Sequence, residues 1–302
     1  MNKGKVVLIG GSGVTDSPGF KDLEWKVQET DIPTIHPVTR QVVGTGRVSY
    51  QEREDGVIFI KRHGRSDSKL GTKGYGPSVT EYAANLVAAR ILGASVVIAS
   101  SAVGSLQEEI PVGSLVVPDD YVDESLRNDN LFGLEIRTHT NRRPAFSKKV
   151  RRILINVGED GFGKFDKVVK SATYVCIPGD SFGTAAEGIK RAQYADIVGM
   201  TACPEASMAQ QLGLHYAIAA FPVDHDADAN HEGGTLAVMK ELSKHDRVPE
   251  YINEVLEAAK RIAVRAPRLD QLVGNVIPGD ASAIENIYLR AIAEDIMQKY
   301  CS

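Results

Sequence analysis

Short apolar runs that alternate with segments of helical periodicity constrain this chain most strongly. The run Ser95–Ser100 (Ser-Val-Val-Ile-Ala-Ser) is almost continuously apolar, as in strands that are covered on both faces in a parallel sheet. The runs Lys5–Ile9 and His215–Pro222 also have the pattern of buried strands. Because strands and helices alternate along most of the chain without a linker or repeat, we expect an α/β fold: one domain with a mixed, largely parallel β-sheet flanked by helices.

The remaining elements are expected from turn residues and helix-capping patterns. Further strands are predicted at Ser114–Val117, Ser171–Ile177 and Asp196–Gly199, with a hairpin at Gly46–Tyr50 and Val57–Lys61. Helices are predicted from Ser78 to Gly93, at Ser147–Val157, after the capping box Thr184-x-x-Glu187, and at Pro204–Leu212, Thr235–Ser243, Pro249–Val264 and Ala283–Lys299. Residues 71–77 are expected to form a loop and residues 119–144 an irregular polar segment. The domain is expected to span residues 1–270, with a C-terminal helical extension at 271–302.

Composition excludes several classes of partner. The net charge of -4 gives no basic surface for nucleic acid, and no apolar run has the length of a membrane-spanning helix. The cysteines Cys176, Cys203 and Cys301 lack metal-ligand spacing and are expected to be free thiols in a reducing compartment. We therefore expect a cytoplasmic protein without a metal site.

The acidic stretch Val223–Asp228 directly follows a predicted buried strand. Open α/β sheets bind their ligands at the carboxyl ends of strands, so Asp224 and Asp226 are candidates for hydrogen bonding to a ligand or for proton donation. A solvated acidic turn is the alternative for this stretch taken alone.

Other predicted strand ends carry groups that suit an anion. Gly10-Gly11-Ser12-Gly13 offers backbone N–H groups and a hydroxyl, although a simple tight turn explains it equally well. Arg62 and His63 offer further donors, and Ser101, Ala102 and Thr201 follow two more strands. Taken singly, Thr201 is more often a helix cap, and Met200 and Phe182 are more often packing residues. Together these side chains predict a phosphate site with acids nearby.

Several enzyme classes lack their motif here. The chain has no P-loop lysine motif, no zinc-ligand spacing and no Gly-x-Ser-x-Gly elbow. A dinucleotide fingerprint that starts at Gly11 and Gly13 would need glycine at position 16, where the chain has Asp16. A nicotinamide-dependent dehydrogenase is therefore disfavoured.

Five motifs in this order resemble the methylthioadenosine phosphorylases, which belong to the trimeric branch of the purine nucleoside phosphorylases. The resemblance covers roughly residues 4–265. The motifs are Ile9-Gly10-Gly11-Ser12-Gly13, Arg62-His63-Gly64-Arg65, residues 101–106, residues 199–206 (Gly-Met-Thr-Ala-Cys-Pro-Glu-Ala) and Asp224-x-Asp226.

The resemblance implies phosphorolysis of 5'-methylthioadenosine or a related 5'-substituted adenosine, giving adenine and a 5-substituted ribose 1-phosphate. It implies no cofactor, since inorganic phosphate is a co-substrate. Phosphate is assigned to Ser12, Arg62, His63, Ser101, Ala102 and Thr201. By the same resemblance Met200 would lie against the ribose and Phe182 beside the base.

The resemblance also gives Asp224 and Asp226 catalytic and base-binding roles at the purine N7 and 6-position. A carboxylate accepts from a 6-amino group and repels a 6-oxo group, so adenine is the expected leaving base. A protonated aspartate at N7 would neutralise the departing base, which requires a raised pKa.

Some positions depart from the family pattern. The family usually has Glu-Gly-Pro-Arg-Phe where this chain has Pro178-Gly179-Asp180-Ser181-Phe182, and the segment after Asp226 is unusually polar and glycine-rich. A different 5'- or 6-oxopurine specificity and a non-catalytic nucleoside-binding homologue therefore stay open as alternatives. The resemblance further implies a homotrimer or a dimer of trimers, with His139 as the candidate residue that reaches a neighbouring active site.

Overall fold

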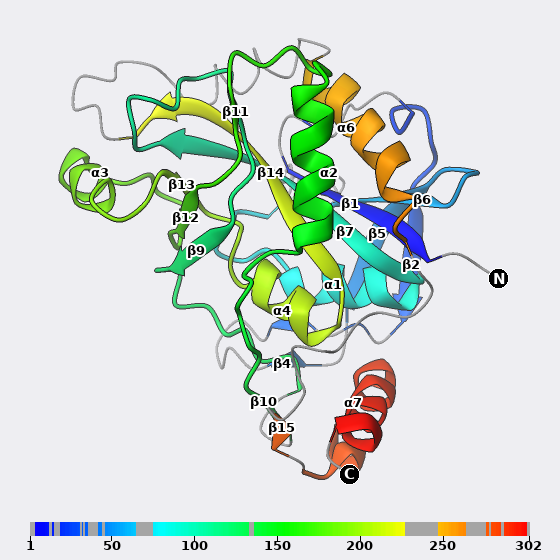
Figure 1. Cartoon of the computed structure of the whole chain (residues 1–302). Helices are drawn as coiled ribbons and strands as arrows, with labels where there is room; N and C mark the ends of the chain where they lie inside the picture. Colours follow the sequence, from blue (N-terminus) through cyan, green and yellow to red (C-terminus); the bar gives the residue numbers. More distant parts are fainter. Residues whose placement is uncertain are drawn as a thin grey trace.

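A central mixed sheet with helices on both faces forms the core of the structure (Figure 1). The computed structural model describes residues 4–11, 14, 19–30, 32, 34–35, 42–43, 46–64, 75–132, 136–226, 247–263, 276–277, 279–284 and 287–300. Helices α2 and α6 pack together over one face, and α1 and α4 pack together over the other. The α/β architecture expected from the alternating pattern is confirmed.

The strands and helices have the following bounds. The strands are β1 Lys5–Gly10, β2 Lys26–Thr30, β3 Thr34–Ile35, β4 Val42–Val43, β5 Gly46–Glu52, β6 Val57–Lys61, β7 Ala94–Ser105, β8 Leu115–Val116, β9 Asp120–Asp123, β10 Arg137–Thr138, β11 Val168–Val169, β12 Thr173–Cys176, β13 Ile197–Gly199, β14 His215–His225 and β15 Val276–Ile277. The helices are α1 Tyr82–Ile91, α2 Lys148–Glu159, α3 Ala185–Arg191, α4 Glu205–Gln211, α6 Arg247–Ala259 and α7 Ile287–Tyr300, with a 3-10 turn at Ala281–Ala283.

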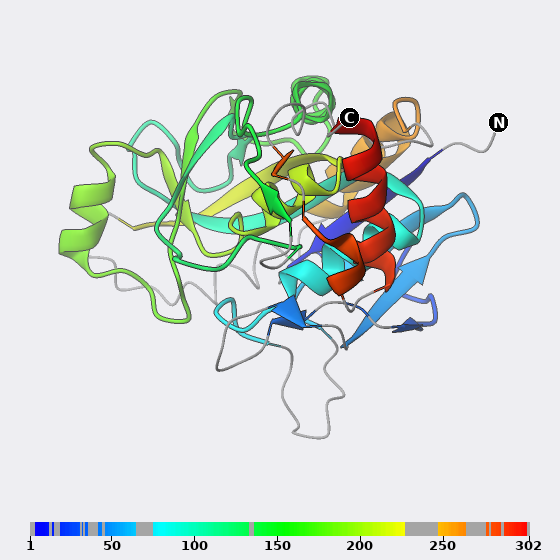
Figure 2. The same cartoon turned by 90° about the horizontal axis from the view of Figure 1, so that it is seen from below.

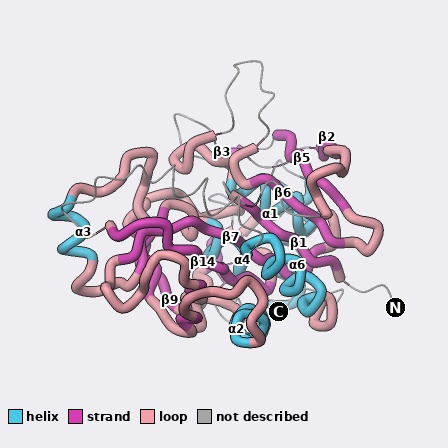
Figure 3. Tube along the Cα trace, turned by 90° about the horizontal axis from the view of Figure 1, so that it is seen from above, coloured by secondary structure: helices cyan, strands magenta, loops and turns pink. Residues whose placement is uncertain are grey.

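The main sheet is parallel at its centre and mixed towards its edges, where β11–β8, β12–β13 and β12–β9 are also parallel pairs. Among the described residues its strands follow the order β11-β8-β14-β7-β1-β6-β5-β2, and β13, β12 and β9 extend it from β7. The pairs β14–β7, β7–β1 and β1–β6 are parallel, whereas β13–β7, β14–β8, β6–β5 and β5–β2 are antiparallel. Figure 3 shows this sheet running across the molecule from β2 and β5 at one end to the region of α3 at the other.

The two longest strands, β7 and β14, continue beyond the ends that the sequence pattern predicted. They pair with each other from His215 opposite Val96 to His225 opposite Ser105, with a register shift between Pro222 and Asp224. Because this ladder of backbone hydrogen bonds continues past the apolar runs, Ser101 and Asp224, expected in loops after the strands, lie within them, and Asp226 directly follows β14. The irregular segment 119–144 likewise contains the short strands β9 and β10.

The predicted capping box at Ser78 is wrong. Helix α1 begins at Tyr82, and neither Ser78 nor the N-cap residue Glu81 provides a side-chain cap. The Ser78 hydroxyl instead donates to Asp180 Oδ2 over 3.2 Å, so a distant loop competes for the group that would cap the helix. The second predicted box is confirmed, since Thr184 and Glu187 satisfy each other's backbone N–H groups at the start of α3.

Helix α7 packs against α1 at the far side of the sheet from α2 and α6 (Figure 2). Its buried residues Leu289, Ala293 and Ile296 recur at helical spacing. The predicted helix at 235–243 and residue Cys301 lie outside the described residues. In the part of the chain that the structure describes, no helix has the length and apolarity needed to cross a bilayer.

Candidate functional site

A cavity of about 410 Å³ lies where β6, β7, β13 and β14 bring their carboxyl-terminal residues together. Most of the residues predicted from sequence line it: Arg62, His63, Ser101, Ala102, Phe182, Met200, Thr201, Asp224 and Asp226. Ser12 lies outside the described residues, although its neighbour Gly11 lines the cavity. The sheet thus gathers segments that are far apart in the sequence into one site.

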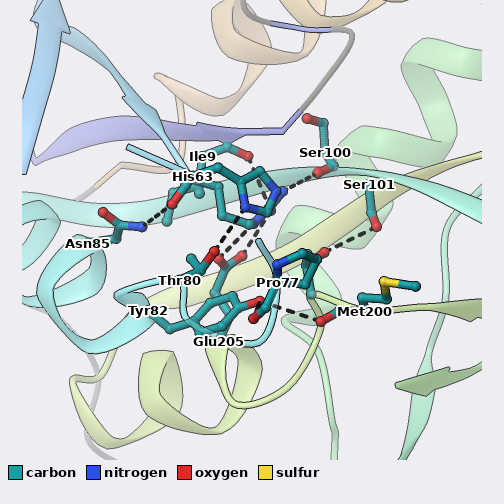
Figure 4. A network of polar contacts seen from close by, with 12 residues as sticks. Ile9, His63, Pro77, Thr80, Tyr82, Asn85, Ser100, Ser101, Met200 and Glu205 are labelled. Carbon is teal, nitrogen blue, oxygen red and sulfur yellow. Dashed lines mark hydrogen bonds and ion pairs between the residues drawn. The ribbon is translucent and has the colours of Figure 1, made fainter. Parts of the chain in front are cut away.

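Arg62 is held rigidly by a buried ion pair at the end of β6. Its Nε and Nη2 atoms donate to the two carboxylate oxygens of Glu205 over 2.9 and 3.1 Å, and Nη1 donates to the Ser100 carbonyl over 2.8 Å. Tyr216 donates its hydroxyl to Glu205 over 2.7 Å. Burial alone would lower the pKa of Arg62, but the Glu205 carboxylate raises it above its ordinary value, so the guanidinium stays charged. Figure 4 shows Glu205, Ile9 and Ser100, whose oxygen atoms accept hydrogen bonds from Arg62.

His63 follows Arg62 and is fixed by a turn that precedes α1. Its Nδ1 lies 2.9 Å from the Thr80 hydroxyl oxygen, and its carbonyl accepts from the Tyr75 N–H over 2.7 Å. Asn85, on α1, donates to the Arg62 carbonyl over 2.9 Å and supports the same corner. Helix α1 therefore positions both donors at the end of β6.

Two hydroxyls lie beside the buried Tyr174 in the same cavity. The Ser101 hydroxyl lies 3.2 Å from the Tyr174 hydroxyl and 3.3 Å from that of Thr201. Ser101 and Thr201 are 5% and 8% exposed, so their hydroxyls are largely shielded from bulk water. With Arg62 they form a group of hydrogen-bond donors suited to an oxyanion.

Asp224 occupies space that a glycine leaves free. It pairs with Gly104 across the β14–β7 ladder, and a Cβ atom on Gly104 would lie 2.9 Å from Asp224 Oδ1 and 2.9 Å from Asp226 Cβ. Asp224 is only 8% exposed, which rules out the solvated turn for this residue. Both carboxylates therefore border the cavity directly.

Asp226 is a half-buried acid with an elevated pKa. Its Oδ2 is buried without a hydrogen-bond partner among the described residues. Burial is the largest cause that raises the pKa of Asp226, the charge of Asp224 raises it further, and Arg191 opposes the shift. A carboxyl group in these surroundings retains its proton at a higher pH than an ordinary aspartate and can act as an acid.

Apolar and planar groups also line the cavity. Met200 and the 59% exposed Phe182 line the cavity, and Asp180 reaches it from the same loop as Phe182. Asp180 accepts hydrogen bonds from the backbone N–H and the hydroxyl of Ser78, so the acid that departs from the family pattern ties the 178–182 loop to the turn before α1.

Some positioning residues were not predicted from the sequence. The Arg127 guanidinium donates to the backbone carbonyls of Met200 and Cys203 over 2.7 and 2.5 Å. It also donates to the Pro178 carbonyl and lies over the ring of Tyr82. It thereby joins the loops that carry Met200 and Phe182. Glu205 could have been predicted, because it belongs to the motif at residues 199–206 and a buried arginine requires an acidic partner. No pattern in the sequence pairs Arg127 with its acceptors, because these are backbone atoms.

Two further predictions concern residues outside this cavity. His139, the candidate for an intersubunit role, is exposed and does not line the cavity of its own chain. Within the described ranges, no group of three or more His, Cys, Asp or Glu side chains is arranged to hold a metal ion.

Comparisons with known proteins agree with this geometry. The family model of the phosphorylase superfamily matches residues 5–266. The chain is 30% identical over 272 residues to an S-methyl-5'-thioadenosine phosphorylase of Anopheles gambiae, an alignment that covers 87% of this chain and 91% of the relative. It is 33% identical over 244 residues to the enzyme of the same name from Thermococcus kodakarensis, covering 80% and 87% of the two chains.

Solved structures show the same likeness. A methylthioadenosine phosphorylase sourced from an antarctic soil metagenomic library superposes with a TM-score of 0.76 at 25% identity, covering 98% of this chain and 99% of the other. The S12T mutant of the adenosine/methylthioadenosine phosphorylase from Schistosoma mansoni, in complex with methylthioadenosine, superposes with a TM-score of 0.68 at 26% identity. That superposition covers 89% of this chain and 99% of the other.

Proposed function

The chain belongs to the phosphorylase superfamily and, within it, to the family of the S-methyl-5'-thioadenosine phosphorylases, and we propose that it catalyses the phosphorolysis of 5'-methylthioadenosine or a related 5'-substituted adenosine. The products are adenine and a 5-substituted ribose 1-phosphate. The reaction requires inorganic phosphate as co-substrate and no metal or organic cofactor.

The spacing of the two polar regions along β7 carries this proposal. Ser101, beside the anion donors, and Gly104, beside the carboxylates, are three residues apart on one strand. At a rise of roughly 3.3 Å per residue this separation is about 10 Å, which leaves room for a phosphate beneath C1' and, beyond the glycosidic bond, for the far edge of the purine. Both ends open into the same cavity.

In this proposal the anion donors bind the nucleophile, inorganic phosphate. Arg62, Ser101 and Thr201 hold phosphate, together with His63, the Ala102 backbone and Ser12. Phosphate held beneath C1' is positioned for attack, and its charge stabilises the positive charge that develops on the sugar as the bond to the purine breaks. Met200 packs against the ribose.

The two carboxyl groups, Asp224 and Asp226, bind and protonate the leaving base. Asp226, with its raised pKa, is suited to donate a proton to N7 as the bond to the sugar breaks, and Asp224 to accept from the 6-amino group. Phe182 offers a flat apolar surface to the purine ring. This assignment predicts adenine as the preferred leaving base.

Phosphate dependence tests the proposal directly. Purified protein is incubated with 5'-methylthioadenosine, adenosine or inosine, with and without phosphate, and free base and sugar phosphate are quantified by chromatography. We expect adenine release that requires phosphate and exceeds hypoxanthine release. Equal release without phosphate would indicate a hydrolase, and tight nucleoside binding without any turnover would indicate a binding protein.

We also propose that the protein assembles as a homotrimer or a dimer of trimers in which His139 approaches a neighbour's cavity. The exposure of His139, outside the cavity of its own chain, supports a role at an interface. Sedimentation velocity measures the assembly. If His139→Ala changes the KM for nucleoside in the trimer, the intersubunit role is supported, and a monomer with full activity would contradict it.

A further inference from the structure

The Thr80 hydroxyl has one proton and two close partners at the edge of the cavity. Its oxygen lies 2.9 Å from the Gly76 carbonyl oxygen and 2.9 Å from His63 Nδ1. A carbonyl can only accept, so the hydroxyl proton is directed to Gly76. The hydroxyl oxygen then offers His63 only a lone pair, and Nδ1 must carry a proton in order to donate to it. Figure 4 shows His63 and Thr80 facing each other.

This arrangement fixes the tautomer of a neutral His63. With the proton on Nδ1, the other ring nitrogen, Nε2, carries a lone pair and is an acceptor. Thr80 is 3% exposed, so water does not compete readily for this hydrogen bond.

The surroundings of His63 favour the neutral ring. Burial is the largest cause that lowers its pKa, the neighbouring Arg62 charge adds to it, and Lys61 acts in the same direction. A hydrogen bond with the Tyr75 backbone opposes the shift most, followed by Asp180 from the 178–182 loop, and Glu205 from α4 is already paired with Arg62. The balance lowers the pKa of His63 to about 4, so the ring is neutral at physiological pH.

The acceptor nitrogen lies on the anion side of the cavity. A Cβ atom placed on Gly11 would lie 3.1 Å from Arg62 Nη1 and 3.8 Å from His63 Nε2, so these two atoms border the same space. The hydrogen bond between His63 and Thr80 uses Nδ1, so Nε2 is the ring nitrogen that borders this space. An oxyanion held by Arg62 there therefore encounters one nitrogen that can accept a proton.

We propose that Thr80 is a positioning residue that presents His63 Nε2 as an acceptor, so that the anion site selects a protonated oxyanion, phosphate or arsenate, over sulfate. The inference rests on the proposed function, in which this site holds phosphate. Phosphate carries a proton at neutral pH and can donate it to Nε2. Sulfate carries none, and its oxygen meets a lone pair unless His63 takes up a proton.

Anion binding to the wild-type protein tests the proposal first. Calorimetric titrations with phosphate, arsenate and sulfate are run from pH 6 to pH 8. Because each bound sulfate requires the uptake of one proton, its affinity should fall about tenfold per pH unit, whereas phosphate and arsenate should keep theirs far better. A sulfate affinity that equals that of phosphate at pH 8 would overturn the proposal.

Variants of Thr80 separate positioning from simple packing. Thr80→Val removes the lone pair that fixes Nδ1–H and should raise the KM for phosphate about tenfold, with the KM for nucleoside changed less than about twofold. Thr80→Ser keeps the hydroxyl and should restore both the KM and the discrimination against sulfate. Failure of the serine variant to restore them would contradict the role of the hydroxyl.

Nuclear magnetic resonance of the ring reports the tautomer independently of turnover. Carbon and nitrogen shifts of His63, assigned by comparison with His63→Gln, should show protonated Nδ1 in the wild-type protein, and the opposite tautomer would refute the inference. If wild-type protein releases no adenine in the presence of phosphate but shows the expected tautomer and anion preference, the proposed function fails while this inference stands.

Discussion

Asp226 is the acid of the cavity whose surroundings depart most from those of an ordinary aspartate. Its Oδ2 is buried without a partner among the described residues, and burial followed by the charge of Asp224 raises its pKa. Such a group is well suited to donate a proton and costs stability when it is charged. An unpaired acid at a ligand cavity is a functional candidate on physical grounds.

Replacement of Asp226 by asparagine should change the selectivity for the base. The amide cannot protonate N7 as an acid, so kcat/KM for adenosine-type substrates should fall by about 10²- to 10⁴-fold. Because N7 and the 6-position lie on the same edge of the purine, an amide beside N7 can also donate to a 6-oxo group, so the loss with inosine should be smaller. Parallel assays of both nucleosides measure the ratio, with Asp22→Asn at an exposed turn as the control. Equal losses for the two nucleosides would contradict the assignment.

At single positions, the sequence was most informative for residues that would contact a ligand and least informative for the residues behind them. Arg62, Thr201 and Asp224 could be selected because charged and hydroxyl groups follow apolar strands and match family motifs. Thr80 and Arg127 could not, because their partners are backbone carbonyls and a histidine that only the folded chain brings near. The positions of such partners depend on loop geometry, which residue types alone do not specify.

At the scale of elements, strand ends and helix starts were harder to predict than the elements themselves. Apolar periodicity located β7 and β14 but placed their ends too early, since backbone pairing continues through polar residues such as Ser101 and Asp224. The cap at Thr184 was predictable because both partners are local, whereas Ser78 bonds to Asp180, 102 residues away. Local sequence patterns therefore predict a helix cap correctly when the hydrogen-bond partner of the capping side chain is also close in the sequence.

Helix α7 offers a test of packing at this scale. Ile296 is fully buried on it, whereas Ile287 on the same helix is 58% exposed. Ile296→Ala should lower the free energy of unfolding by about 2–4 kcal/mol, because it removes buried methyl groups and leaves a cavity. Ile287→Ala, the matched control, should change it by less than about 0.5 kcal/mol. Urea denaturation measures both, and equal effects would show that α7 does not pack as described.

For the whole molecule, the α/β class was predictable from alternation alone, but the arrangement of the sheet was not. The sequence predicted a largely parallel sheet, and the parallel centre of β14, β7, β1 and β6 confirms this. The antiparallel contact of β13 with β7 brings Val198 opposite Gly104 and thus closes the cavity beside the carboxylates. Nothing in the composition of these short strands indicates their direction, because pairing partners depend on the path of the intervening loops.

The same arrangement predicts how ligands stabilise the whole molecule. The anion donors and the carboxylates lie about 10 Å apart along β7, so phosphate and adenine should bind together without displacing each other. Each ligand at about 100 times its Kd should add roughly 2.7 kcal/mol to the stability of the fold. Because the two do not react, thermal unfolding with each ligand alone and with both measures equilibrium binding. The shift in Tm with both ligands should equal the sum of the two single shifts. If the second ligand adds no further shift, phosphate and adenine compete for one end of the cavity. The spacing along β7 would then not separate a phosphate from a base.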